Sequence, residues 1–293
     1  MDKYTEKKQR NQVFQKFIER HVREGQMHLI RECNTFLSFV ADQTLEKKKL
    51  YKANPCKNRF CPVCAWCKAR KDALGLSLMM QYIKQEEKKE FIFLTLTTPN
   101  VTSEHLENEI KAYNHAFQKM FKRKKVNTIA KGYVRKLEVT YNQKRDDYNP
   151  HFHVLIAVNK SYFKDTKSYI SQKEWLNLWR DVTGIDEITQ VHVQKIKQNN
   201  NKELYEMAKY SGKDSDYLIN QKVFDTFYKS LKGKQILVYS GLFKEARKKL
   251  KNGDLDYLKE VDPTEPNFPY ALNFYFGQNQ DFGIFTEICP CRN

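Results

Sequence analysis

Three β-rich segments in the middle of the chain constrain its fold most strongly. Residues 91–98 (FIFLTLTT) are a β-branched and aromatic run that stops at Pro99, which is typical of a buried strand. Residues 132–142 and 151–158 predict two further strands, and the polar stretch between them predicts a hairpin. Helical patterns separate the other predicted strands, so we expect an α+β fold with a central antiparallel sheet flanked by helices.

The patterns along the chain predict three parts. Residues 1–87 combine amphipathic helical segments with a cysteine-rich loop, and we expect an N-terminal helical, zinc-binding region there. Residues 88–220 contain the predicted sheet. Residues 221–293 alternate helical and strand patterns, which predicts a C-terminal α/β extension.

The composition favours a folded protein that binds a polyanion. Lys and Arg number 52 against 35 Asp and Glu, a net charge of +17, and neutralising phosphates releases condensed counterions. A solvated, lysine-rich surface is the alternative. No stretch approaches the length of about 18 apolar residues that a membrane helix needs, and no secretory signal opens the chain. We therefore expect a cytoplasmic protein without a membrane partner, with cysteines that are reduced or bound to metal.

Four cysteines within twelve residues indicate a structural metal site. Cys61 and Cys64 have the spacing at which two thiolates bind one ion from a tight turn, and zinc takes four ligands of this kind. Three thiolates at 61, 64 and 67 would be crowded around one ion. We therefore expect Zn²⁺ on Cys33, Cys56, Cys61 and Cys64, with Cys67 as a substitute ligand. The alternative is a set of buried thiols without a metal.

His151 and His153 lie two residues apart in a predicted strand, so they point to one face of the sheet. On the preceding strand Glu138 stands among apolar neighbours, where a charge is costly to bury unless it is paired or bound to metal. Two imidazoles and a carboxylate with open positions suit Mn²⁺ or Mg²⁺ beside a substrate phosphate. The alternative is a surface ion pair of Glu138 with Lys136 or Arg135.

Residues 202–211 predict a helix that carries a possible nucleophile. Glu206 and Tyr210 are four residues apart, on one helical face, and Lys213 follows three residues later. Beside a metal-bound phosphate, Tyr210 has the chemistry of a nucleophile that Lys213 would assist, and Glu206 could activate water as a general base. The alternative is an ordinary amphipathic helix with a Glu–Tyr contact.

With these motifs in this order, the chain resembles the HUH endonucleases. It looks most like the rolling-circle replication initiators of plasmids that have one catalytic tyrosine and a glutamate. The resemblance covers roughly residues 28–217 and implies the HUH endonuclease fold. The segments that carry it are CKNRFCPVC, FLTLTTPN, GYVRKLEVTYN, NPHFHVLI and ELYEMAKYSGK.

The resemblance implies a mechanism. His151, His153 and Glu138 would hold Mn²⁺ or Mg²⁺ while Tyr210 attacks a phosphodiester in the extruded single strand of a double-stranded origin. The products would be a 5′-phosphotyrosine adduct and a 3′-OH that primes synthesis. Glu206 would then assist termination in place of a second tyrosine.

The resemblance also implies partners in the bacterial cytoplasm, namely origin DNA, a host helicase and the replication machinery; a homodimer is left open. We expect Arg135, Lys136 and Lys209 to contact DNA. The alternative functions are a non-enzymatic, zinc-containing DNA-binding regulator, a transposase or relaxase of the same fold, and a protein that acts on RNA.

Overall fold

The chain forms two compact units. The computed structural model describes residues 2–196, 207, 214–259, 270–277 and 282–290. One unit comprises Met1–Lys68 and Glu260–Asn293, and the other comprises Ala69–Lys259. The boundary falls within the long helix α3 (Pro62–Gln85), and each unit is described by itself below.

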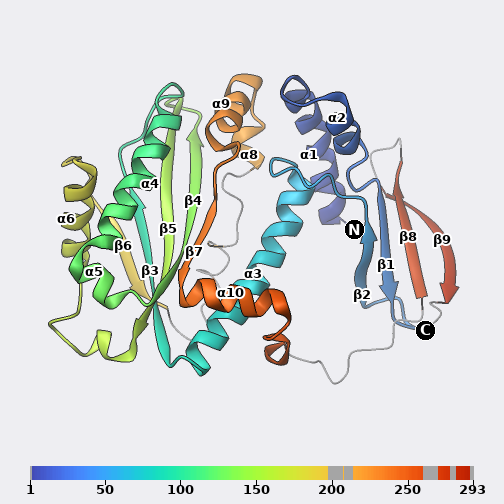
Figure 1. Ribbon diagram of the computed structural model, residues 1–293. Helices are drawn as coiled ribbons and strands as arrows, with labels where there is room; N and C mark the ends of the chain where they lie inside the picture. The colour runs from blue at the N-terminus through green and yellow to red at the C-terminus, as the bar shows by residue number, and fades with distance from the viewer. Residues whose placement is uncertain (1, 197–206, 208–213, 260–269, 278–281, 291–293) are drawn as a thin grey trace. The chain divides into compact units, whose positions relative to one another are not determined.

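The larger unit is built on a five-stranded sheet with the strand order β6-β3-β5-β4-β7 (Figure 1). Every pairing in it is antiparallel. The strands are β3 (Lys89–Thr97), β4 (Gly132–Asn142), β5 (Asp147–Asn159), β6 (Val191–Lys195) and β7 (Leu237–Gly241). The expected α+β class with a central antiparallel sheet is thereby confirmed.

Helices cover both faces of this sheet because its central strands are apolar on both sides. On one face, residues of α3 and α10 (Leu242–Asn252) pack in a cluster with Phe93 and Leu155. On the other, the rings of α4 (Leu106–Lys122) and α6 (Gln172–Thr183) pack around Phe152. The shorter helices of this unit are α5 (Lys124–Ile129), η2 (Lys160–Phe163), α8 (Asp214–Tyr217), α9 (Gln221–Leu231) and η3 (Asp256–Leu258).

Helix α6 shows how local sequence sets the ends of an element. The Ser171 hydroxyl accepts a hydrogen bond from the Glu174 amide, and the Glu174 carboxylate accepts one from the Ser171 amide, which closes a capping box. At the other end Gly184 has a φ of 71°, a left-handed conformation that glycine adopts without strain.

The smaller unit contains a second sheet, with the strand order β2-β1-β8-β9. Its elements are α1 (Asp2–Ile18), η1 (Glu19–His21), α2 (Glu24–Arg31), β1 (Phe36–Ala41), β2 (Lys48–Ala53), β8 (Tyr270–Phe276) and β9 (Phe282–Pro290). The sequence predicts an N-terminal region of helices, whereas the structure also has the two strands β1 and β2 there. They form because β8, from the far end of the chain, pairs with β1.

The compact units also differ from the three-part division expected from the sequence. Strand β7 pairs with β4 and α10 packs in the cluster on the central sheet, which joins much of 221–293 to the larger unit. Strand β8 joins the N-terminal residues instead. Over the parts of the chain that are described, no helix combines the length and the apolar character needed to cross a bilayer.

Candidate metal centres

Strands β4 and β5 bring Glu138, His151 and His153 together on one face of the central sheet. Glu138 lies opposite His151 in the antiparallel register. The Oε2 atom of Glu138 is 3.5 Å from Nε2 of His153 and 4.0 Å from Nε2 of His151. One possible ligand atom from each of the three residues lies within 4.8 Å of the others. The three predicted ligands therefore converge on one point.

The carboxylate of this group is buried but charged. Glu138 is only 4% exposed, and Nζ of the fully buried Lys136 donates a hydrogen bond of 2.6 Å to its Oε2 atom. Burial raises the pKa of Glu138, but the hydrogen bond with His153 and the charge of Lys136 outweigh burial and hold this pKa well below its usual range. The ion pair considered in the sequence analysis thus exists, and it lies inside the metal-ligand group rather than at the surface.

Hydrogen bonds orient the two imidazoles. Nδ1 of His151 is 3.2 Å from the carbonyl oxygen of Asn149, so this nitrogen carries the proton and Nε2 keeps its lone pair toward Glu138. Nδ1 of His153 is 3.2 Å from the hydroxyl of Thr95 on β3, and its ring stacks on Phe93. Burial also lowers the pKa of His151, which favours the neutral form. Neutral nitrogens and a charged carboxylate are the donors that a divalent cation requires, so these residues fit one.

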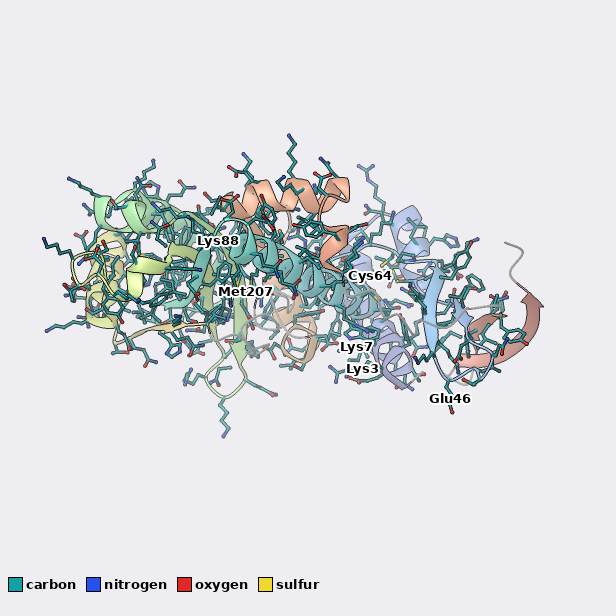
Figure 2. The ribbon with its side chains drawn as sticks, turned by 90° about the horizontal axis from the view of Figure 1, so that it is seen from below. Lys3, Lys7, Glu46, Cys64, Lys88 and Met207 are labelled. Carbon is teal, nitrogen blue, oxygen red and sulfur yellow. The ribbon has the colours of Figure 1, made fainter. Side chains whose placement is uncertain are left out.

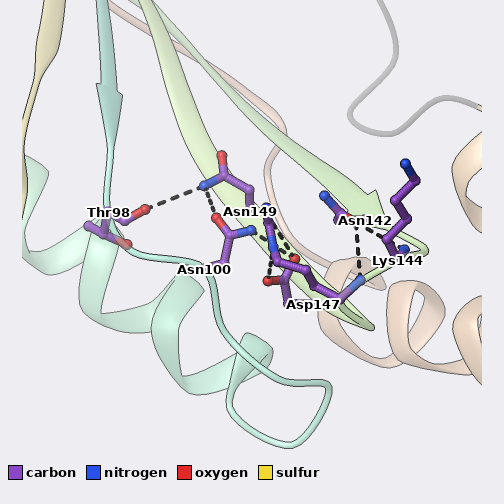
Figure 3. Close-up of polar contacts among 7 residues, drawn as sticks. Thr98, Asn100, Asn142, Lys144, Asp147 and Asn149 are labelled. Atoms are coloured by element: carbon purple, nitrogen blue, oxygen red, sulfur yellow. Dashed lines mark hydrogen bonds and ion pairs between the residues drawn. The ribbon is translucent and has the colours of Figure 1, made fainter.

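A network of polar side chains fixes the end of β5 that carries His151 (Figure 3). The side-chain amide of Asn149 donates to the side-chain oxygen of Asn100 over 2.7 Å and to the backbone oxygen of Thr98 over 3.4 Å. Asn100 in turn donates to Asp147 over 2.8 Å. The carbonyl oxygen of Asn149 also accepts a hydrogen bond from His151. The network therefore links the residues that follow β3 to the group that orients the imidazole.

The expected tyrosine segment lies almost entirely outside the described residues, and Glu206, Lys209, Tyr210 and Lys213 are among those not described. Met207 is described (Figure 2). It is helical and 1% exposed, and it belongs to the apolar cluster that covers the same face of the sheet as His153.

Two of the expected DNA contacts are buried. Lys136 is enclosed with Glu138. Arg135 is 5% exposed and points to the opposite face, where its guanidinium lies over the rings of Phe117 and Phe152 and donates to Asn114. Burial lowers the pKa of Arg135 to about 10. Both cations make these contacts inside the protein, and their expected contact with DNA stays a prediction.

The smaller unit gathers four cysteine sulfurs. Sγ of Cys33 lies 3.6 Å from that of Cys61 and 3.5 Å from that of Cys64, and Cys56 lies 3.7 Å from Cys64. A zinc tetrahedron with bonds of about 2.3 Å has edges of roughly 3.8 Å. The spacing therefore fits a zinc ion, and the group that the structure brings together does not include Cys67.

The surroundings of the four sulfurs suit a metal with thiolate ligands. Hydrogen bonds with Cys56, Cys61 and Cys64 lower the pKa of Cys33, whereas burial raises the pKa of Cys61. The side-chain amide of Asn34 donates to Cys33 over 3.0 Å, and that of Asn11 donates to Cys61 over 3.2 Å. Lys8, which is 2% exposed, donates to the carbonyl oxygen of Cys33 over 2.6 Å. These donors offset the net negative charge that four thiolates leave around Zn²⁺.

Sequence reasoning missed Lys8 and Asn11 as partners of the cysteine group. The only signal was their position on the buried side of α1, where Lys8, Asn11, Phe14 and Ile18 recur at helical spacing. A lysine on such a face needs a partner, and the sequence does not say which.

Comparison with known proteins agrees with the motifs. A family model described as "Replication protein" matches residues 47–271. A "Protein rep" of Staphylococcus aureus is 82% identical over 221 residues, which cover 75% of this chain and 96% of that protein. A "Protein rep" of Bacillus amyloliquefaciens is 34% identical over 276 residues, 84% of this chain and 81% of that protein. No solved structure matches the chain. The family match includes the histidine strand and the segment with Tyr210.

Proposed function

This chain belongs to the replication protein family, and from that premise we propose that it initiates rolling-circle replication by nicking one strand of a plasmid's double-stranded origin. The observation that carries the proposal is the convergence of Glu138, His151 and His153 in a buried group on the central sheet. A buried carboxylate is costly unless it is paired or bound to metal, and ionisable groups in such surroundings gather at functional sites.

We propose that these three residues hold a divalent cation. When bound, the cation would withdraw negative charge from the phosphodiester that is to be cut. Two imidazole nitrogens favour Mn²⁺ over Mg²⁺, because Mg²⁺ prefers oxygen ligands and keeps its waters. The role of Lys136 would be to keep Glu138 ionised, and that of Asn149 to keep the lone pair of His151 directed at the ligand group.

Tyr210 is the proposed nucleophile. Its phenolic oxygen would form a bond to phosphorus while the bond from phosphorus to the 3′ oxygen breaks, which leaves a 5′-phosphotyrosine and a 3′-OH. The phenol must lose its proton and the leaving oxygen must gain one, and Lys213 would stabilise the charge between these events. A host helicase would then unwind the duplex, and the replication machinery would extend the new strand from the 3′-OH.

Met207 supports this assignment. It is buried on the sheet face that carries the histidines, and Tyr210 is only three residues further along the chain. Three residues span at most about 10 Å. On a continuous helix the two side chains would also share one face. Glu206 would act on the same helix as the general base that ends the cycle.

The test is the formation of a covalent adduct. The protein is incubated with Mn²⁺ and a single-stranded oligonucleotide that carries the origin of its own plasmid, and adducts are detected after denaturation in SDS. We expect an adduct with the wild type and none with Tyr210→Phe. Tyr205, five residues earlier, is a second tyrosine of the same segment, and Tyr205→Phe is the matched control that should keep the adduct. A full adduct in Tyr210→Phe overturns the nucleophile, and DNA binding without any wild-type adduct favours the non-enzymatic regulator.

A further inference from the structure

A pocket of about 270 Å³ lies in the larger unit, at the end of β4 that is remote from Glu138. Its lining includes Phe121 of α4 and Tyr133 of β4. Tyr133 is five residues from Glu138, which is roughly 17 Å along a strand, and an odd separation points its side chain to the opposite face. The pocket is therefore distinct from the metal-ligand group.

The pocket offers aromatic surface. The ring of Phe121 stacks on the buried ring of Phe117 with centroids 4.3 Å apart, and the ring of Tyr133 lies 4.6 Å from it. Phe121 and Tyr133 are half-buried, so part of each ring remains open to the pocket. Rings that are fixed from behind and open in front are platforms on which nucleic acid bases stack.

The pocket is also positively charged. Its lining includes Lys122 and Lys131 and no acidic side chain. The neighbouring cations Arg123 and Lys125 form ion pairs with Asp181 and Glu174 of α6. Within the described part of the chain, by contrast, neither Lys122 nor Lys131 forms an ion pair, and Nζ of Lys131 donates a hydrogen bond of 2.9 Å to the carbonyl oxygen of Thr128. No carboxylate neutralises either ammonium there, so both lysines can attract an anionic ligand.

Two glycines keep one wall of the pocket free of side chains. Gly132 and Gly241 pair across β4 and β7. A Cβ atom at Gly132 would lie 2.6 Å from the backbone nitrogen of Leu242, so no larger residue fits there. The close approach of the strands leaves bare backbone in the lining, beside the side-chain amides of Gln118 and Asn127.

We propose that this pocket binds one nucleotide of single-stranded DNA. Its base would stack on Phe121 and Tyr133, its phosphates would contact Lys122 and Lys131, and the amides would contact the edge of the base. A pocket of about 270 Å³ is too small for a duplex. The proposal rests on the proposed function, and it adds a contact for the single strand away from the site of cleavage.

The first test separates bases from phosphates. Fluorescence anisotropy measures binding of the full chain to a labelled oligothymidylate and to an abasic oligonucleotide of equal length. We expect Phe121→Leu to weaken binding of the thymidylate by roughly fivefold or more and to leave the abasic strand nearly unaffected. An equal effect on both strands, or none on either, overturns the stacking role.

The second test does not disturb the packing of Phe121. Lys122 and Lys119 are both exposed on α4, but only Lys122 lines the pocket. We expect Lys122→Ala to reduce the slope of log affinity against log salt by about 0.7, the value for one phosphate contact on a single strand. Lys119→Ala, the matched control, should leave the slope unchanged. Equal slopes for both variants overturn the phosphate contact.

Three further outcomes identify the ligand and separate this proposal from the proposed function. Displacement of the oligothymidylate by an equal concentration of dTTP would identify a site for free nucleotides and overturn the strand contact. If Phe121→Leu forms the full adduct at Tyr210 and binds the single strand as tightly as the wild type, the pocket proposal is wrong and the proposed function stands. A wild type that binds no single strand would reject the proposed function as well.

Discussion

At the scale of single residues, the buried pair of Lys136 and Glu138 is the most consequential feature of the site. Lys136 is fully enclosed, and its ammonium is 2.6 Å from the carboxylate. Removing one member of a buried pair leaves the other charge without compensation, which typically costs about 3–5 kcal/mol. The pair therefore links the stability of the sheet to the charge state of a proposed metal ligand.

We expect Lys136→Met to lower the free energy of unfolding by about 3–5 kcal/mol, as measured by urea denaturation without added metal. The double variant Lys136→Met/Glu138→Gln removes both charges and should recover most of this loss. If the single variant unfolds like the wild type, Lys136 does not compensate the charge of Glu138.

The histidines predict a dependence of stability on pH. Burial lowers the pKa of His151 below its ordinary value of 6.5, so below that pH the unfolded chain binds a proton that the folded chain resists. The pKa of Glu138 is lowered from its ordinary value of 4.5, so the stability that the ionised carboxylate contributes is lost only at more acidic pH. The free energy of unfolding should therefore fall as the pH drops below about 6.5.

The measurement is a series of urea denaturation curves across this pH range for the wild type and for His151→Asn. The variant has no imidazole to titrate at this position, so its stability should change less steeply with pH. Identical slopes in the two proteins would show that His151 is not the group that responds.

At the scale of elements, the cysteine group draws on three segments of the smaller unit. Cys33 follows α2, Cys56 lies in the loop after β2, and Cys61 and Cys64 lie at the start of α3. A metal bound in a preformed group of this kind contributes its binding energy to folding. The group thus orders the beginning of the helix that continues into the larger unit.

We expect Cys33→Ser to lose zinc, as measured by the metal content of the purified protein, and to melt at a lower temperature. Cys67→Ser is the matched control, because Cys67 lies outside the group of four, and it should retain zinc. Loss of zinc from Cys67→Ser with retention in Cys33→Ser would reverse the assignment.

The elements of the central sheet could be predicted because their signals are local. Strand β4 has the bounds expected from its alternating pattern, and β5 includes the expected segment and extends it at both ends. The pairing of Glu138 with His151 follows from a hairpin of adjacent strands. What could not be predicted is that the polar side chain of Lys136 is enclosed, because burial depends on the helices that cover the face.

At the scale of the whole molecule, the second sheet was missed for a different reason. Strand β1 pairs with β8, and more than 200 residues separate them in the chain. A short apolar run such as Phe36–Ala41 does not distinguish a strand from a buried helical segment until its partner is known. Arg135 illustrates the same limit, since its position between two rings depends on α4 packing against the sheet.

We expect the phenol of Tyr210 to lie beside a cation held by Glu138, His151 and His153. Fluorine NMR of the protein labelled with fluorotyrosine tests it directly, because bound Mn²⁺ broadens the resonances of nearby nuclei, and the signal of Tyr210 is assigned by its absence in Tyr210→Phe. We predict that Mn²⁺ broadens this signal in the wild type and not in His151→Ala. A Tyr210 signal that stays sharp while Mn²⁺ is bound at the histidines would contradict the account.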